Sequence, residues 1–309
     1  MTDDLVAQQF VRARLDAAPL PGFPGLMPTS LTAAYDHQDA ALGLWPDHVA
    51  GWKIGRIAPP WSARFGEERL VGPIFCRGIR HVQPGDAAEY PVFEGGFAAV
   101  EAEFVFRLLA DPPADKVGWT VEEAAALECA LHIGIATAGS PLAAINELGP
   151  TVIISDFGNN AGLLLGPEIP DWRTRPLETL TTETFIDGES VGRGGALSLP
   201  GGPIAGLAYA LGRCARLGRP LRSGYVISSG ATTGVHDIRS GQHARAKFDG
   251  VGELACRPYA ARAELSTSAD AAGHSYWGRG GMLLCRYCCV PRCGSIDGLR
   301  RARERLPDR

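Results

Sequence analysis

Two glutamates one residue apart, Glu101 and Glu103, are the side chains best placed to do chemistry. They lie within FAAVEAEFVFRLL (residues 97–109), whose alternation and content of Phe and Val predict a β-strand. Residues i and i+2 of a strand point to the same face with Cα atoms ~7 Å apart, so the carboxylates repel each other unless a cation lies between them. A hard divalent cation such as Mg²⁺ or Mn²⁺ would meet this need. The pattern leaves open an alternative, in which both are ordinary glutamates on a solvent-facing strand.

A lysine lies within a short apolar segment, GWKIG (residues 51–55), which we predict to be a strand. Lys53 has Trp52 and Ile54 as neighbours, and a lysine held among apolar residues can supply a fixed positive charge to a carboxylate or an enolate. The alternative is an ordinary strand lysine whose amine reaches solvent. Taken alone, the segment favours this alternative.

Two polar segments follow predicted strands. SDFGNNAG (residues 155–162) contains Asp, Asn and Gly, which form turns by side-chain hydrogen bonding, so it is either a turn or a set of polar groups that lines a pocket at the end of the sheet. SSGATTGVH (residues 228–236) offers hydroxyls and backbone N–H groups that can hold a carboxylate. It lacks the GxxxxGK[ST] spacing of a phosphate-binding loop.

The elements that must position these groups are mainly strands. Short or alternating apolar runs indicate further strands at residues 133–138, 151–155, 162–166, 224–230 and 242–257. Alternation around Asp187-Gly188 predicts a hairpin. Helical spacing predicts helices over residues 4–17, 120–131 and 202–218, and one that begins at Ser30. The sum is an α+β chain with a large mixed, mostly antiparallel sheet.

Composition and charge exclude several classes of protein. Of the 309 residues, 45% are hydrophobic and 21% charged, which is enough for a sizeable core. The net charge of −4 excludes nucleic-acid binding by bulk charge alone. No run of ~18 apolar residues predicts a membrane helix, and the acidic N-terminus lacks the apolar core of a signal peptide. We therefore expect a cytoplasmic protein that binds neither nucleic acid nor membrane.

The end of the chain differs from the rest. Residues 263–309 are rich in Arg, Gly and Cys and show no sustained strand or helix period until their last dozen residues. The cysteines there could bind zinc as a small knuckle. The alternative, which we favour, is a disordered extension, because no apolar pattern surrounds the cysteines. These cysteines are Cys285, Cys288, Cys289 and Cys293.

The order of the motifs is more specific than any one of them. GWKIG, then Glu-x-Glu on a strand, then ALHIGI leading into SPLAAINELGP, then SDFGNNAGLLLG, then SSGATTGVHDIRSGQHARAKFDGVGEL resembles the 2-keto-4-pentenoate hydratase family. That family includes 2-oxo-3-hexenedioate decarboxylases and belongs to the fumarylacetoacetate hydrolase superfamily. The resemblance covers residues 4–262.

The resemblance implies a mixed, mostly antiparallel β-sheet roll that holds Mg²⁺ or Mn²⁺ on three carboxylates. Two of these ligands fall on Glu101 and Glu103, and the family's lysine falls on Lys53. The polar segment that follows the third ligand falls on Asp156, which we expect to be catalytic together with Lys53. The hydroxyl-rich loop implies substrate binding by Ser229, Gly230 and Thr232.

The segment over residues 56–71, with two prolines and several charges, predicts a loop and indicates a division of the chain there. We expect an N-terminal helical and strand region over residues 1–70, a catalytic β-roll domain over residues 71–262, and the tail over residues 263–309. A homo-oligomer is expected, with a small 2-oxo or 2-hydroxy acid as the partner.

One departure from the family concerns the third metal ligand. The carboxylate that the family carries would fall on Ala136, and a methyl group cannot coordinate a metal. Water can fill the position, since Mg²⁺ readily keeps several waters, but affinity should fall. Glu128 and Glu147 are possible substitutes, although neither is at the matching position.

The expected activity follows from the resemblance. The cation chelates the substrate's carboxylate and C2 oxygen and stabilises an enolate, which serves both addition of water and loss of CO₂. We expect a hydratase acting on a short 2-hydroxy-dienoate from the meta-cleavage of aromatic compounds. The alternatives are a 2-oxo-3-hexenedioate-type decarboxylase, an acylpyruvate hydrolase, or a catalytically weakened relative that has lost tight metal binding through Ala136.

Overall fold

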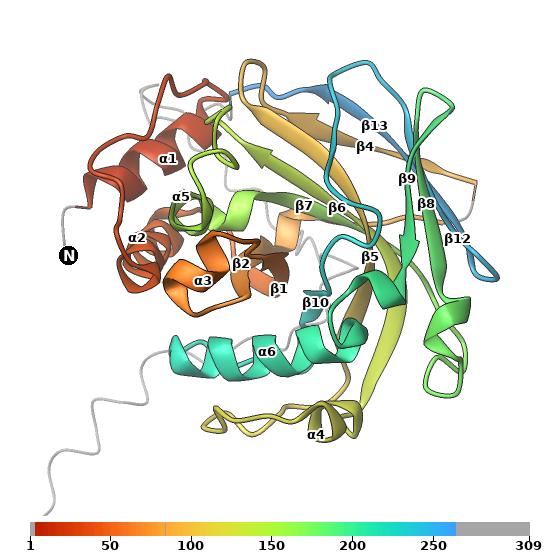
Figure 1. Ribbon diagram of the computed structural model, residues 1–309. Helices are drawn as coiled ribbons and strands as arrows, with labels where there is room; N and C mark the ends of the chain where they lie inside the picture. Colours follow the sequence, from red (N-terminus) through yellow and green to blue (C-terminus); the bar gives the residue numbers. More distant parts are fainter. Residues whose placement is uncertain (1–3, 84, 264–309) are drawn as a thin grey trace, which may run out of the picture. The chain divides into compact units, whose positions relative to one another are not determined.

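The computed structural model describes residues 4–83 and 85–263, which form two mixed β-sheets with helices packed against them (Figure 1). The larger sheet has the order β2-β1-β10-β5-β6-β7-β3, with β11 paired to β5, and the smaller has the order β4-β13-β12-β8-β9. The strands of the larger sheet are β1 (Val49–Arg56), β2 (Arg69–Phe75), β3 (Ile79–His81), β5 (Phe97–Leu108), β6 (Cys129–Ser140), β7 (Asn160–Glu168), β10 (Val226–Ser228) and β11 (His236–Asp237). Those of the smaller sheet are β4 (Ala87–Val92), β8 (Thr181–Ile186), β9 (Glu189–Gly195), β12 (Ala244–Phe248) and β13 (Gly252–Ala260).

Strand directions agree with the predicted class. The pairs β1–β10, β3–β7 and β4–β13 are parallel, and the other strand pairs in the described part of the chain are antiparallel. The α+β class with a mixed, mostly antiparallel sheet is therefore confirmed. Strand β1, from the predicted N-terminal region, pairs with β10 from the predicted catalytic region, so both regions contribute to one sheet. The division at residue 70 stays a prediction, and the predicted tail lies outside the described residues apart from Ala263.

Strand β5 lies between β10 and β6 and is buried on both faces over most of its length. Side chains on both faces of β5 therefore contact other parts of the protein and not water. Phe104 of β5 packs edge to face on Phe248 of β12, with ring centroids 5.8 Å apart, so the two sheets share one core. Any polar side chain on β5 must consequently find its partners inside the protein.

Six α-helices accompany the sheets. They are α1 (Leu5–Leu15), α2 (Leu31–Leu44), α3 (Trp61–Phe65), α4 (Val121–Ala125), α5 (Pro150–Ser155) and α6 (Gly202–Arg216) among the described residues. Helices α1 and α5 both pack on α2, and α6 lies against β1 and β2 with α4 beside it (Figure 1). The predicted N-caps are confirmed, because Ser30 accepts from the Ala33 N–H and Thr120 forms a capping box with Glu123.

Two expectations about these elements need correction. The helix predicted over residues 120–131 ends at Ala125, because β6 already begins at Cys129. The apolar run at residues 151–155 is helix α5 and not a strand. Pro150 occupies its first position, where a missing N–H costs nothing, and Gly149 before it turns the chain with φ 95°. The predicted hairpin is confirmed, since Asp187 and Gly188 join β8 to β9 with positive φ.

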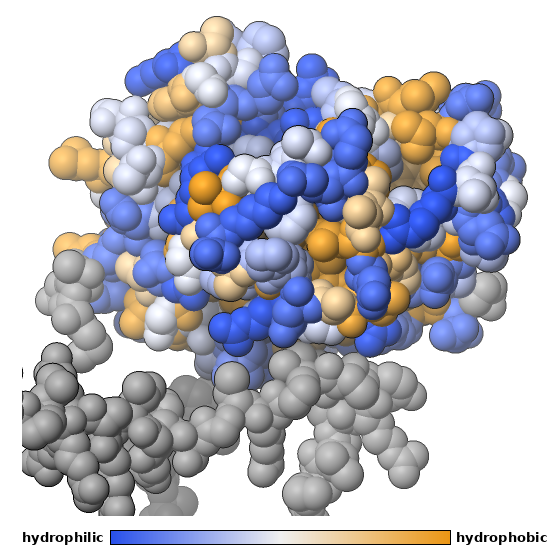
Figure 2. All heavy atoms as spheres, turned by 90° about the horizontal axis from the view of Figure 1, so that it is seen from below, coloured by the Kyte–Doolittle hydropathy of each residue, from blue (hydrophilic) through white to orange (hydrophobic). Residues whose placement is uncertain are grey.

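Seen from below, the molecule presents hydrophilic residues with smaller apolar patches between them (Figure 2). No helix in residues 4–83 and 85–263 combines the length and the apolar character needed to cross a bilayer.

Candidate functional site

The two glutamates of β5 are buried. Glu101 is 5% exposed and Glu103 is fully buried, so the alternative of two ordinary surface glutamates is wrong. They emerge from the same face of the central strand of the larger sheet, as the alternation predicts. Two carboxylates inside a protein core require compensation by hydrogen bonds, a cation or a proton.

Lys53 supplies part of that compensation. Its side chain is 3% exposed, and its Nζ lies 3.2 Å from Oε2 of Glu101 and 2.9 Å from Oδ1 of Asn159. The strand register explains the meeting, because Lys53 of β1 pairs with Ser228 of β10, which pairs in turn with Val105 of β5. The alternative of a lysine that reaches solvent is therefore wrong.

Glu103 accepts hydrogen bonds from the end of the neighbouring strand β10 and from the loop that follows it. Its Oε2 accepts hydrogen bonds from the Ser228 hydroxyl at 2.5 Å and from the Gly230 N–H at 2.8 Å. Its Oε1 is buried and has no hydrogen-bond partner among the described residues. Burial, and then the nearby Glu101 carboxylate, raise the pKa of Glu103 to about 8, although Lys53 and the two hydrogen bonds favour the charged form.

Asn159 completes this polar cluster. Its Oδ1 accepts from Lys53, and its Nδ2 donates to Oδ1 of Asn146 at 3.0 Å. Phe157, Gly158 and Asn159 have φ of 54°, 64° and 51°, a run in the left-handed region that only surrounding structure can hold in place. A Cβ at Gly72, the cross-strand partner of Lys53, would lie 2.3 Å from the Phe157 carbonyl oxygen, so this glycine allows the turn to approach β2.

The Asn159 role is one that the sequence did not single out. The segment at residues 155–162 was expected to be either a turn or a pocket lining, and it is both. The signal was the Gly-Asn-Asn composition, because Gly and Asn tolerate left-handed backbone. The side chain of residues 155–162 that reaches Lys53 depends on how closely β2 approaches this segment.

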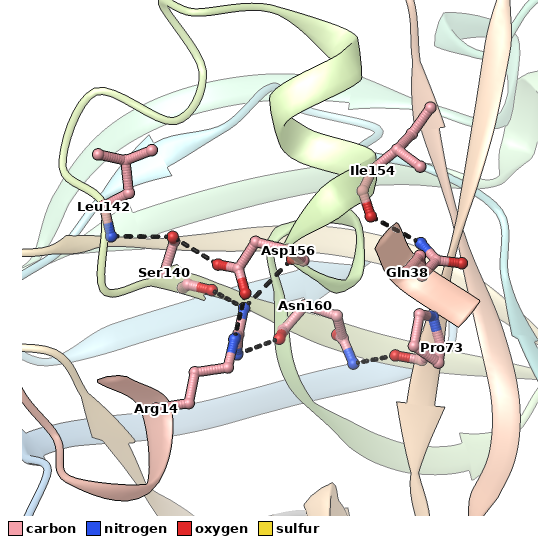
Figure 3. Close-up of polar contacts among 9 residues, drawn as sticks. Arg14, Gln38, Pro73, Ser140, Leu142, Ile154, Asp156 and Asn160 are labelled. Carbon is pink, nitrogen blue, oxygen red and sulfur yellow. Dashed lines mark hydrogen bonds and ion pairs between the residues drawn. The ribbon is translucent and has the colours of Figure 1, made fainter. Parts of the chain in front are cut away.

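Asp156 lies in a different network, which Figure 3 shows. Its carboxylate accepts from Nε of Arg14 at 2.5 Å and from the Ser140 hydroxyl at 2.6 Å. The same arginine donates to the carbonyl oxygens of Gly139 and Asn160 (Figure 3). Asp156 does not line the cavity beside Lys53, so the structure does not bring it to the other predicted site residues.

The hydroxyl-rich loop divides into two parts. Ser229 and Gly230 line the cavity beside Lys53 and Glu101, and the Ser229 hydroxyl is buried without a hydrogen-bond partner in the described chain. Thr232 does not line this cavity. Its hydroxyl bonds to the Ala102 carbonyl oxygen at 2.7 Å and to the Thr182 hydroxyl at 2.8 Å, which ties the loop to both sheets.

The cavity has a volume of about 620 Å³, which suits a small organic acid. Its polar lining includes Lys53, Glu101, Asn159 and Ser229. Apolar side chains form much of the remaining wall, among them Ile54, Ile57, Leu70, Ile153, Leu199 and Val235.

The donors present suit a hard divalent cation, with fewer charged ligands than the three that the resemblance implies. Glu101 and Glu103 can neutralise a 2+ ion, and the unpartnered Oε1 of Glu103 is an oxygen donor without a present use. Ala136 pairs directly with Glu101 across β5–β6, so the third carboxylate is missing from the matching face. No cluster of three His, Cys, Asp or Glu side chains is formed within residues 4–83 and 85–263. Glu128 and Glu147 are exposed and do not line the cavity, so neither replaces it.

A serine motif elsewhere carries no nucleophile. GESVG (residues 188–192) matches the GxSxG pattern, in which the serine occupies a turn from strand to helix. Here the segment belongs to the β8–β9 hairpin, and exposed Ser190 donates to Glu183 at 2.6 Å.

Comparisons with known proteins agree with this fold. No family model matches the chain. Over 210 residues the chain is 26% identical to a 2-keto-4-pentenoate hydratase of Burkholderia vietnamiensis (strain G4 / LMG 22486), which covers 67% of this chain and 77% of the relative.

Two solved structures share the fold. The 4-oxalocrotonate decarboxylase of Pseudomonas putida G7, complexed with magnesium and adipate, matches 82% of this chain and 96% of its own with a TM-score of 0.68 and 17% identity. The fumarylpyruvate hydrolase of Pseudomonas aeruginosa, in complex with Mn²⁺ and pyruvate, matches 68% of this chain and 89% of its own with a TM-score of 0.51 and 18% identity. The chain is therefore similar in sequence to a 2-keto-4-pentenoate hydratase and has the fold of these two solved enzymes.

Proposed function

We propose that this chain is a metal-dependent hydratase that adds water to a short 2-hydroxy-dienoate of the 2-keto-4-pentenoate type, within the catabolism of aromatic meta-cleavage products. The observation that carries the proposal is the buried cluster of Lys53, Glu101 and Glu103, of which Lys53 and Glu101 line a cavity of suitable size. The similarity to a 2-keto-4-pentenoate hydratase supports it. So does the presence of Mg²⁺ or Mn²⁺ with small organic acids in the two solved relatives.

Glu101 and Glu103 would hold the divalent cation. When bound, Mg²⁺ or Mn²⁺ supplies a Lewis acid that stabilises negative charge developing on the C2 oxygen of the substrate. Glu103 is anchored by Ser228 and Gly230 through one oxygen, which leaves its other oxygen for this task.

Lys53 would act on the organic anion. An ammonium group has three N–H donors, and Glu101 and Asn159 use two of them. The third donor can bind the substrate's carboxylate or its C2 oxygen, and the charge is worth more here than in water because the side chain is buried. The Ser229 hydroxyl supplies a further hydrogen bond from the opposite strand end.

Loss of CO₂ is the second reaction that these residues can support. It needs the same stabilisation of an enolate, and the fold matches 4-oxalocrotonate decarboxylase with a TM-score of 0.68. An acylpyruvate hydrolase would need a general base beside the attacking water, and Asp156 cannot serve because it is held by Arg14 and Ser140 away from the cavity. If the chain is instead a catalytically weakened relative, the absence of a carboxylate at position 136 should appear as poor affinity for the metal.

An ultraviolet assay with 2-hydroxypenta-2,4-dienoate tests the proposal. The full chain, with Mn²⁺ or Mg²⁺ added, should consume the dienoate, and a chelator should stop the reaction. Glu101→Gln should lower the rate at least about a hundredfold, because it removes one of two charged ligands. Glu128→Gln is the matched control, since Glu128 is exposed and outside the cavity. Equal rates with and without metal, or in Glu101→Gln and the parent, would contradict the proposal.

A further inference from the structure

We propose that Asn146 is a substrate-binding residue, whose side-chain Nδ2 group donates a hydrogen bond to the carboxylate of the organic acid. This inference rests on the proposed function, because it takes the cavity beside Lys53 as the place where the acid binds. Asn146 lines that cavity together with Lys53 and Asn159. It is exposed, whereas Asn159 is buried, so Asn146 is the more accessible of the two amides.

Lys53 determines the orientation of both amide groups. An ammonium group has donors only, so the Asn159 atom that lies 2.9 Å from its Nζ must be the carbonyl oxygen, Oδ1. The Nδ2 group of Asn159 is then the atom that lies 3.0 Å from Asn146, and because it can only donate, Asn146 must accept with its Oδ1. The Nδ2 group of Asn146 remains, and it donates to no other residue in the described part of the chain.

The backbone that carries Asn146 is anchored in the core. Asn146 lies in the turn between β6 and α5, directly after Ile145, which is fully buried. Ile145 packs in an apolar cluster with Phe10 and Leu142, and its N–H donates to the Leu142 carbonyl oxygen at 3.2 Å. A donor on a segment held in this way needs little further ordering when a ligand binds, so more of the hydrogen bond's free energy contributes to affinity.

A carboxylate is the acceptor that suits this donor. Carboxylate oxygens only accept hydrogen bonds, and their charge makes these bonds stronger than those of neutral oxygens. Only the Asn159 amide separates Asn146 from Lys53, so an acid bound by the third N–H of Lys53 lies beside the Nδ2 group of Asn146. Because the amide is neutral, it adds a donor for the acid without disturbing the ion pair of Lys53 and Glu101.

Two variants at one position separate binding of the acid from support of Asn159. Asn146→Ala removes both the donor and the oxygen that accepts from Asn159. Asn146→Asp keeps an oxygen that can accept from Asn159 but has no N–H to offer the acid. Glu147→Gln is the matched control, because Glu147 is the next residue, is exposed and does not line the cavity. Calorimetry on the full chain, saturated with Mn²⁺, measures the dissociation constant of 2-oxopentanoate, the saturated analogue of 2-keto-4-pentenoate.

The parent should bind 2-oxopentanoate at least about tenfold more tightly than Asn146→Ala, as expected for the loss of a hydrogen bond to a charged group. Asn146→Asp should bind it no more tightly than Asn146→Ala, because its carboxylate lacks the donor and repels the acid. Glu147→Gln should bind it like the parent.

Two outcomes overturn this inference and leave the proposed function standing, since in both the parent binds the acid. One is an equal dissociation constant in the parent and Asn146→Ala. The other is binding by Asn146→Asp as tight as that of the parent, which would show that Asn146 only supports Asn159. Failure of the parent to bind 2-oxopentanoate overturns the proposed function and this inference with it.

Discussion

Arg14 and Asp156 form a buried ion pair across 142 residues of sequence, with Nε and Oδ1 2.5 Å apart. The arginine comes from α1 and the aspartate from the turn that follows α5. Because Arg14 also donates to the Asn160 carbonyl oxygen, it holds both ends of the left-handed run that carries Asn159. The N-terminal helix thereby fixes the residue that binds Lys53.

Breaking this pair should destabilise the protein strongly. Arg14→Met leaves the Asp156 carboxylate buried with one hydroxyl donor, so we expect the free energy of unfolding to fall by about 3 kcal/mol or more. Urea unfolding measures it. Arg12→Met is the matched control, because Arg12 and its partner Asp16 are exposed and such a pair contributes about 0–1 kcal/mol. Similar losses in both variants would show that the burial of Arg14 has no energetic weight.

The raised pKa of Glu103 predicts a pH dependence of stability in the metal-free protein. The folded protein keeps this proton up to about pH 8, whereas the unfolded chain releases it near the ordinary value of 4.5. The stability that the proton supports is therefore complete below about pH 4.5 and is lost as the pH rises toward 8. Unfolding curves in the presence of a chelator should show the parent losing stability across this range more steeply than Glu103→Gln. Exposed Glu253→Gln should follow the parent, and identical slopes in all three proteins would refute the assignment.

Lys53→Met separates the role of the lysine from that of the cation. We expect kcat to fall by at least about a hundredfold, as for the loss of one charge-stabilising donor, with a smaller change in Mn²⁺ affinity. The affinity should hold because Lys53 occupies an oxygen of Glu101, and its removal frees that oxygen. Calorimetry and the ultraviolet assay measure the two quantities, with exposed Lys247→Met as the control. A loss of Mn²⁺ affinity with unchanged kcat would assign the lysine to the metal site instead.

Ala136→Glu should tighten the binding of divalent metal. Ala136 is the cross-strand partner of Glu101, so a side chain at this position emerges on the same face and adds a third carboxylate. A tenfold gain in affinity needs only about 1.4 kcal/mol. Against this, a new buried carboxylate costs several kcal/mol in the metal-free protein.

The variant should therefore melt below the parent in chelator and gain more than the parent from Mn²⁺. Titration of Mn²⁺ against melting temperature and activity checks both effects. If the two proteins bind Mn²⁺ alike, a carboxylate at position 136 does not reach the ion.

The placement of Glu101 and Glu103 on one face could be predicted from sequence because its signal is local, whereas the burial of Lys53 could not, since its segment alone favours a lysine that reaches solvent. Alternation on one strand places Glu101 and Glu103 on one face whatever the strand pairs with. The local signal gave a wrong prediction at residues 151–155, because a short apolar run is equally typical of a strand and of a buried helix. The segment is a helix that begins at Pro150.

Other parts of the site depend on long-range pairing. Asn159 reaches Lys53 only because β2 and the left-handed turn approach each other. Asp156 is bonded outside the cavity to Arg14, which lies 142 residues earlier in the chain. Spacing along the chain contains none of this information.

The placement of the glutamates on β5 has a kinetic consequence. Backbone amides exchange with solvent through local openings, and the amides of a central, doubly paired strand exchange last, since they require the largest opening. The loop at residues 228–236 is bonded to the same strand, because the Ser229 and Thr232 N–H groups donate to the Phe104 and Ala102 carbonyl oxygens. We therefore expect the amides of β5 around Glu101 and Glu103, and these two amides of the loop, to exchange as slowly as the core of the protein.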